Sequence, residues 1–166
     1  MKKYIAGGYI SEGKMEILYR GQSRRYGEII LNVRGDKAPS VWRYGGILQG
    51  TGCYSIIYGW DNPDDMKGST IDKHVVYSDT IGQYVGRTDI NEKKIFTGDV
   101  VRFGTYRTIA EVAWSETKLQ FVFIIYSKVN GTEEIVPESE VELYLFDDDI
   151  EIIGNIYDNP ELLKGE

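Results

Sequence analysis

Cysteine and histidine are nearly absent from this chain of 166 residues, which contains only Cys53 and His74 of these two types. One cysteine excludes an internal disulfide, and one cysteine with one histidine excludes a zinc cluster of the usual kind. No run of 18 apolar residues predicts a membrane span, and the N-terminal segment Met1–Lys14 lacks the apolar core of a signal peptide. We therefore expect a soluble protein of the bacterial cytoplasm in which Cys53 is packed rather than reactive.

Basic residues are scarce outside the N-terminal part of the chain. The net charge is −7, yet Met1–Tyr44 holds nine Lys and Arg against four Asp and Glu, a local charge of +5 that leaves −12 for the remainder. Glu133–Glu151 contains nine acids and no base. Because the acidic bulk repels phosphate, we do not expect uniform attraction to nucleic acid. Three interpretations remain for the basic part. It forms a solvated surface, or it pairs with the acidic part within or between subunits. In the third interpretation it forms a nucleic-acid face made of Arg20, Arg24, Arg25 and Arg34.

The sequence contains partial matches to catalytic, phosphate-binding and metal-binding motifs, and each match lacks a residue that the motif requires. A phosphate-loop pattern starts at Gly8, but Met15 stands where magnesium needs a Ser or Thr. His74 has acids and serines nearby without a nucleophile motif around it. A calcium-loop pattern starts at Asp89 but lacks the required glycine and glutamate, and Asp147–Asp149 suits a solvated turn. We therefore predict no enzyme activity, no cofactor and no metal.

Tyrosine, glycine and β-branched residues dominate what is present, with 13 Tyr and 19 Gly. Short apolar runs bounded by glycine or polar residues predict a mainly β protein. Glu111–Trp114 and Leu119–Tyr126 are joined by a short polar link, which predicts a hairpin. Asn159 followed by Pro160 predicts a short helical turn, as does Asn62 with its following proline. The predicted strands occupy residues 3–10, 14–21, 27–33, 40–50, 53–60, 73–78, 93–96, 99–104, 109–116, 119–128, 133–139 and 150–158.

Residues 79–103, DTIGQYVGRTDINEKKIFTGDVVRF, form the stretch richest in turn residues and acids. One interpretation takes Asp89, Glu92 and Asp99 as paired carboxylates of an active site. The other takes the stretch as a corner of a small β-barrel, in which glycines adopt positive φ and short polar side chains bind the nearby backbone. We favour the corner because it accounts for more of the residues. Its turn residues are Gly86, Gly98, Asp89 and Asn91.

This stretch resembles the signature of the YopX-like family of phage and prophage proteins, and the C-terminal IIGNIYDNPELL resembles the closing motif of that family. The two motifs lie far apart but in the right order, and the resemblance covers residues 42–163. The matching residues are Thr80, Gln83, Tyr84, Gly86, Asp89, Ile95, Gly98, Asp99 and Val101 in the first motif, and Ile153, Gly154, Asn155, Ile156, Tyr157, Asn159, Pro160 and Leu162 in the second. We also expect Gly82 to belong to the structural motif of the first stretch.

The resemblance implies an SH3-like barrel encoded by a phage or prophage, with no known enzyme activity. We expect the chain to divide into an N-terminal β region, residues 1–78, and a barrel with a C-terminal helical turn, residues 79–166, unless the two form one continuous domain. The chain departs from the family at Glu92, where glycine is usual, and in lacking the family's basic-aromatic opening. We expect a non-enzymatic accessory protein that binds a host or phage protein or forms a homo-oligomer. A nucleic-acid-binding module using the basic N-terminal face is the alternative.

Overall fold

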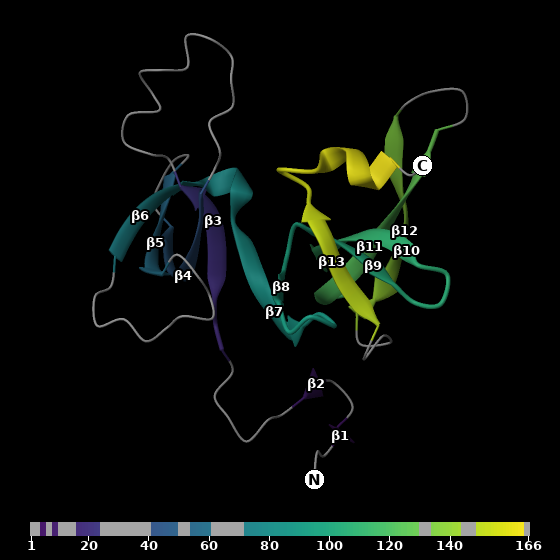
Figure 1. Ribbon diagram of the computed structural model, residues 1–166, viewed down its shortest axis with the longest axis horizontal. Coiled ribbons are helices and arrows are strands. Elements are labelled where there is room, and N and C mark those ends of the chain that lie inside the picture. The colour runs from purple at the N-terminus through teal and green to yellow at the C-terminus, as the bar shows by residue number, and fades with distance from the viewer. Residues whose placement is uncertain are drawn as a thin grey trace. The chain divides into compact units, whose positions relative to one another are not determined.

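The computed structural model describes residues 4–5, 8–9, 16–23, 41–49, 54–60, 72–129, 134–143 and 149–164. These residues form short antiparallel strands with a few turns of 3-10 helix, which confirms the predicted mainly β fold (Figure 1). The chain divides into two compact units. We call residues 17–84 the first unit, and residues 85–166 together with 1–16 the second unit. None of the helices in the described part of the chain has the length and apolar character that a membrane crossing requires.

The first unit is built on a meander of three strands, β4, β5 and β6, with β3 alongside. Strand β3 pairs with β4 along its length, meets β6 at Ser23 and Val76, and pairs with the start of β7 at Tyr19 and Gln83. Thr80 ties η2 to this sheet, because its hydroxyl accepts a hydrogen bond from the Gln22 amide at 2.9 Å and donates one to the Tyr77 carbonyl at 2.8 Å. The elements are β3 (Tyr19–Ser23), β4 (Val41–Gln49), β5 (Tyr54–Trp60), β6 (Asp72–Tyr77), η2 (Ser78–Thr80) and β7 (Gly82–Thr88).

The second unit contains a five-stranded antiparallel sheet in the order β12-β11-β10-β9-β13. Strands β9 to β12 follow one another as a meander, and β13 returns to pair with β9. Strand β8 neighbours β7, and β1 pairs with β2 as a separate hairpin. The elements are β1 (Tyr4–Ile5), β2 (Gly8–Tyr9), β8 (Lys94–Phe96), β9 (Asp99–Phe103), β10 (Thr108–Ser115), β11 (Gln120–Lys128), β12 (Ile135–Glu142), β13 (Ile150–Asn155) and η4 (Pro160–Lys164).

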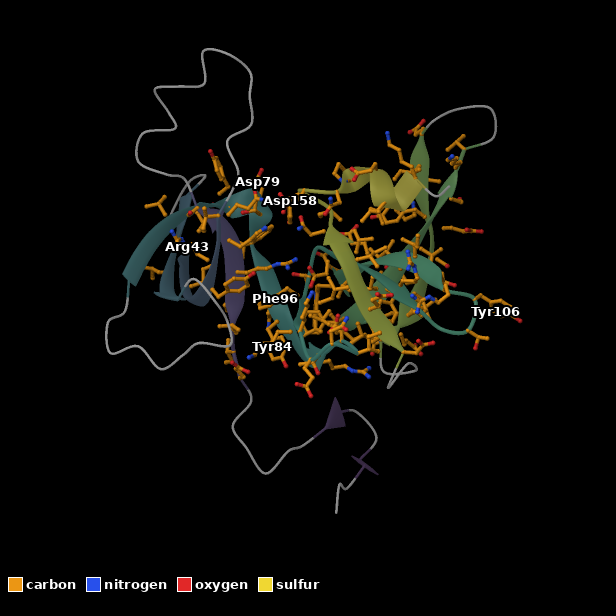
Figure 2. All side chains as sticks on the ribbon, in the orientation of Figure 1. Arg43, Asp79, Tyr84, Phe96, Tyr106 and Asp158 are labelled. Atoms are coloured by element: carbon orange, nitrogen blue, oxygen red, sulfur yellow. The ribbon has the colours of Figure 1, made fainter. Side chains whose placement is uncertain are left out.

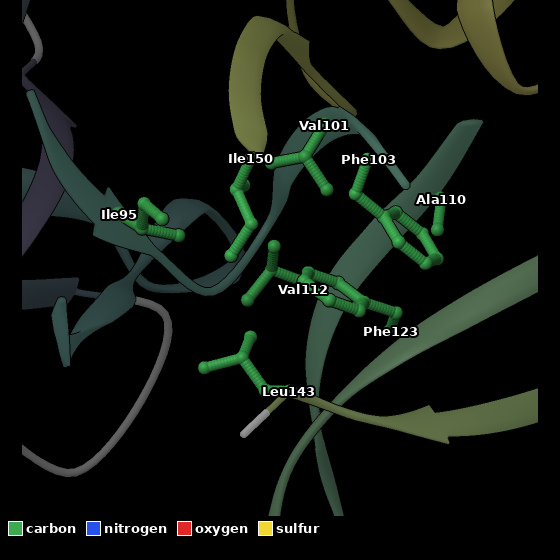
Figure 3. Close-up of a cluster of buried hydrophobic side chains, with 8 residues drawn as sticks. All are labelled: Ile95, Val101, Phe103, Ala110, Val112, Phe123, Leu143 and Ile150. Carbon is green, nitrogen blue, oxygen red and sulfur yellow. The ribbon is translucent and has the colours of Figure 1, made fainter. Parts of the chain in front are cut away.

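Alternating residues of these strands form the core of the second unit (Figure 3). Val112 pairs with Phe123 across β10 and β11, so both side chains lie on the same face, and both are fully buried. The ring of Phe123 stacks on that of Phe103, with 4.3 Å between centroids. The core cluster is Ile95, Val101, Phe103, Ala110, Val112, Phe123, Leu143 and Ile150.

Most of the sequence-based expectations within the described residues agree with this fold. The hairpin of β10 and β11 closes at Ser115 and Gln120, and the C-terminal helical turn begins at Pro160 as predicted. Two expectations differ. Residues 82–88 form strand β7, although no strand was predicted there, and the predicted SH3-like barrel is not confirmed, because the five-stranded sheet is not closed. The predicted strand at 27–33 and the turn at Asn62 lie outside the described residues.

Candidate functional site

Asp89 organises the loop that joins β7 to β8. Its side chain is only 6% exposed, and its Oδ1 accepts hydrogen bonds from the backbone amides of Asn91 at 2.8 Å and Lys93 at 2.9 Å. The Asp89 amide donates to the Lys93 carbonyl at 2.8 Å, and the Glu92 amide donates to the Asp89 carbonyl at 3.0 Å. A short acidic side chain that bonds the backbone two residues ahead is the expected device for such a turn. The turn role predicted for Asp89 therefore agrees with the structure.

The same loop also attaches to β13, at a residue 63 positions further along the chain than Asp89. The second carboxylate oxygen of Asp89 accepts a hydrogen bond from the Ile152 amide at 3.2 Å. The neighbouring Ile90 amide donates to the Ile150 carbonyl at 2.9 Å. Asp89 and Ile90 thus bond backbone groups of β13, which pairs with β9 in the sheet.

Thr97 and Gly98 form the tight turn from β8 into β9, and Asp99 is the first residue of β9. Gly98 has a φ of +84°, and its amide donates to the Val112 carbonyl at 2.8 Å. Asp99 is 1% exposed, and its Oδ2 accepts a hydrogen bond from the Phe96 amide at 2.8 Å. Positive φ is the conformation that favours glycine, so the predicted role of Gly98 has a direct backbone reason.

The C-terminal motif folds against this turn. Asn155 pairs with Asp99 across β13 and β9, and the Ile156 amide donates to the Gly98 carbonyl at 2.9 Å. A Cβ atom added to Gly98 would lie 3.0 Å from Cε2 of Tyr157. The two sequence motifs, more than 50 residues apart, therefore meet at one point of the second unit.

Asn155 and Gly154 shape the exit from β13 into η4. The Asn155 side-chain oxygen accepts from the amides of Tyr157 at 3.0 Å and Asp158 at 2.9 Å, and its side-chain nitrogen donates to the Asp158 carboxylate at 2.9 Å. A Cβ on Gly154 would lie 2.6 Å from Oδ1 of Asn159. Pro160 then opens η4, where a residue without an amide hydrogen is tolerated.

The carboxylates of this junction accept hydrogen bonds from the backbone. Asp89 accepts from three amides and Asp99 accepts from the Phe96 amide, and both side chains are buried, whereas Glu92 is exposed. Within the residues that the structure describes, no group of three His, Cys, Asp or Glu side chains could hold a metal ion. The two buried carboxylates of this junction are therefore bonded to its own backbone.

The remaining predicted residues lie elsewhere. Gly82 pairs with Arg20, and the Tyr84 amide donates to the Leu18 carbonyl at 2.8 Å, both within the first unit. In the second unit Gly86 has a φ of +82°, with open space where a Cβ would lie. Arg20 is 7% exposed, with its guanidinium carbon 4.7 Å from the centroid of the Trp42 ring, so it does not lie on an open basic surface. The other members of the predicted nucleic-acid face, Arg24, Arg25 and Arg34, lie outside the described residues.

The sequence of the chain matches the model of one protein family. The family model described as YopX protein matches residues 47–164, which is more than half of the chain and includes both motifs. The chain belongs to the YopX protein family. No curated protein matches it.

In this YopX-family chain, Glu92 stands where the resemblance implied glycine, and the structure gives the physical reason for that preference. Glu92 has a φ of +63°, in the left-handed region. A residue with a side chain costs about 1–2 kcal/mol there, whereas glycine does not. The loop keeps its shape because Asp89 holds the amides on both sides of Glu92.

We expect Glu92→Gly to raise the free energy of unfolding by about 0.5–1 kcal/mol, since relief of the left-handed strain exceeds the entropy lost by glycine. Urea denaturation of the purified protein measures this. Lys93→Gly is the matched control, because Lys93 is an exposed neighbour in the same loop without positive φ, and it should lower stability. Equal destabilisation by the two glycines would contradict the assignment of strain to Glu92.

A second polar feature of the YopX-family sheet escaped sequence reasoning. Glu111 on β10 is half-buried, and the Tyr126 hydroxyl on β11 donates a hydrogen bond to its Oε2 at 2.5 Å. Burial raises the pKa of the Glu111 carboxyl above its ordinary value, and the Tyr126 hydrogen bond opposes that rise. Burial, with the neighbouring carboxylate, also raises the pKa of Tyr126. Tyr126 is the diagonal neighbour of Glu111 across the two strands, because Glu111 pairs with Ile124. This neighbourhood depends on the register of the two strands, which the sequence does not reveal.

The raised pKa of Glu111 predicts a pH dependence of stability. The folded state holds the proton of Glu111 more tightly than the unfolded state does. The resulting stabilisation is therefore fully present below the pKa that Glu111 has in the unfolded state, and it is lost as pH rises through the pKa that Glu111 has in the folded state. We expect Glu111→Gln to become more stable relative to wild type as pH rises from about 4 to about 7, measured by urea denaturation at each pH. Tyr126→Phe should do the reverse and steepen the loss, because it removes the hydrogen bond that favours the carboxylate. A pH-independent difference for Glu111→Gln would contradict the raised pKa.

One face of the sheet in the first unit exposes apolar side chains. The registers pair Leu48 with Ile56 and Ile56 with Val75, so Leu48 and Val75 lie in one cross-strand row on the same face, and Tyr77 follows two residues along β6. Leu48 is 54% exposed, Val75 41% and Tyr77 37%, whereas Val76 between them is fully buried. We call Leu48, Val75 and Tyr77 the β4–β6 apolar face. A sheet face that contacts water usually carries polar residues, so this face is more apolar than is usual for a solvent-exposed face.

Proposed function

We propose that this YopX-family chain is a non-enzymatic accessory protein of a phage or prophage that works by binding protein, either a partner or a second copy of itself. The observation that carries the proposal is the β4–β6 apolar face, where three apolar residues remain exposed on strands β4 and β6, on either side of β5. Burying such side chains against another protein releases about 25 cal/mol for each Å² of apolar surface. The absence of catalysis is part of the proposal, supported by the engagement of Asp89 and Asp99 with backbone amides.

The strand edges of the second unit favour contact through side chains rather than through added strands. At β13, the backbone groups of Ile150 and Ile152 already bond to the loop of Asp89. Strand β12 carries Pro137, which has no amide hydrogen to donate, and the Glu140 carbonyl accepts a hydrogen bond from Lys118 Nζ at 2.9 Å. Proline and charged residues on an outer strand discourage strand addition.

The second unit also offers exposed aromatic side chains that support a binding role. Tyr106 is 94% exposed at the turn between β9 and β10, and Figure 2 shows it pointing away from the sheet. Trp114 is 49% exposed and meets Phe121 edge-to-face, with 5.2 Å between ring centroids. Tyrosine and tryptophan are enriched at protein interfaces. The return of β13 to pair with β9, the first strand of the meander, also suits the SH3-like barrel that we propose for this unit.

The experiment compares wild type with Leu48→Glu/Val75→Glu, which adds two charges to the β4–β6 apolar face. The matched control is Ile90→Glu/Leu119→Glu, which adds two charges at exposed apolar residues of the second unit. Light scattering at micromolar concentration measures self-association, and affinity capture from host cells measures partner binding. Thermal melts check that all three proteins are folded.

We expect wild type and the control to self-associate or to retain the same protein, and the face variant to lose this by tenfold or more. A wild type that is monomeric and retains no protein, or a face variant that behaves as wild type, would contradict the proposal. Repeating light scattering at high salt tests whether pairing of the basic and acidic parts contributes, because exposed charge pairs are screened within about 8–10 Å near physiological ionic strength. Retention on DNA at low salt that disappears at high salt would instead support the nucleic-acid alternative.

A further inference from the structure

We draw no further inference here: the strongest candidate, the exposed outer strand β12 with the carboxylates of Glu138, Glu140 and Glu142, is an acidic cluster on a strand interrupted by Pro137 and contacted by Lys118, and nothing in the described part of the chain points to a ligand for it.

Discussion

Gly98→Val is expected to lower the free energy of unfolding by about 2–4 kcal/mol, the largest effect among the turn glycines. Two costs combine at this position. The φ of +84° strains any residue with a side chain, and a β-branched one most of all. The new Cβ would also lie 3.0 Å from the Tyr157 ring, at the point where the two family motifs meet. Urea denaturation followed by circular dichroism measures the loss.

Gly86→Val separates these two costs. Gly86 has nearly the same φ, +82°, but nothing lies within 4 Å of its added Cβ. It should therefore lose only the backbone part, about 1–2 kcal/mol. Combining Gly98→Val with Tyr157→Ala should show a favourable coupling energy, because the smaller side chain removes the clash. If Gly98→Val is no worse than Gly86→Val, the contact with Tyr157 does not matter to stability.

Asp89→Ala is expected to lower the free energy of unfolding by about 3 kcal/mol, which is the second large effect. The alanine leaves three backbone amides, those of Asn91, Lys93 and Ile152, without their carboxylate acceptor. A buried donor left unsatisfied costs about 1–3 kcal/mol, and water that reaches the amides of the exposed Asn91 and Lys93 recovers part of the total. Thermal or urea denaturation gives the value.

Asp89→Asn and Asn91→Ala are the matched controls. Asp89→Asn keeps one acceptor oxygen and should fall between wild type and Asp89→Ala. Asn91→Ala removes an exposed side chain whose amide lies 3.4 Å from the Asp89 carboxylate, so it should change stability by no more than about 0.5 kcal/mol. A catalytic Asp89 would behave in the opposite way, because removing a functional carboxylate leaves the fold as stable or more stable while activity is lost.

Turn chemistry was the most predictable part of the candidate site. Asp89 and Gly98 act through their own or nearby backbone, and such local preferences depend on a few neighbouring residues. The hairpin between β10 and β11 was predictable for the same reason, since an alternating pattern and a short polar link lie next to each other in the chain.

Strand β7 shows where local reasoning failed. Its residues include two glycines and read as a turn, yet Gly82 and Gln83 pair with β3, which lies some 60 residues earlier. Strand formation at weak β-formers depends on a partner strand, and the partner is not visible in the local sequence. The prediction for Arg20 was also wrong. Arg20 was expected to lie on an exposed basic face, but it is buried beside Trp42.

The mainly β class, the positions of most strands, the hairpin of β10 and β11, the turn at Asp89 and membership of the YopX family can all be predicted from the sequence. These features follow from short-range periodicity, turn preferences and motif order. Three other features become visible only in the folded chain: Tyr157 lies beside Gly98, Asp89 bonds to β13, and Leu48 and Val75 share an exposed row. Each of these contacts joins residues far apart in the chain, and strand register, which sets them, comes from packing of the whole sheet rather than from any local pattern.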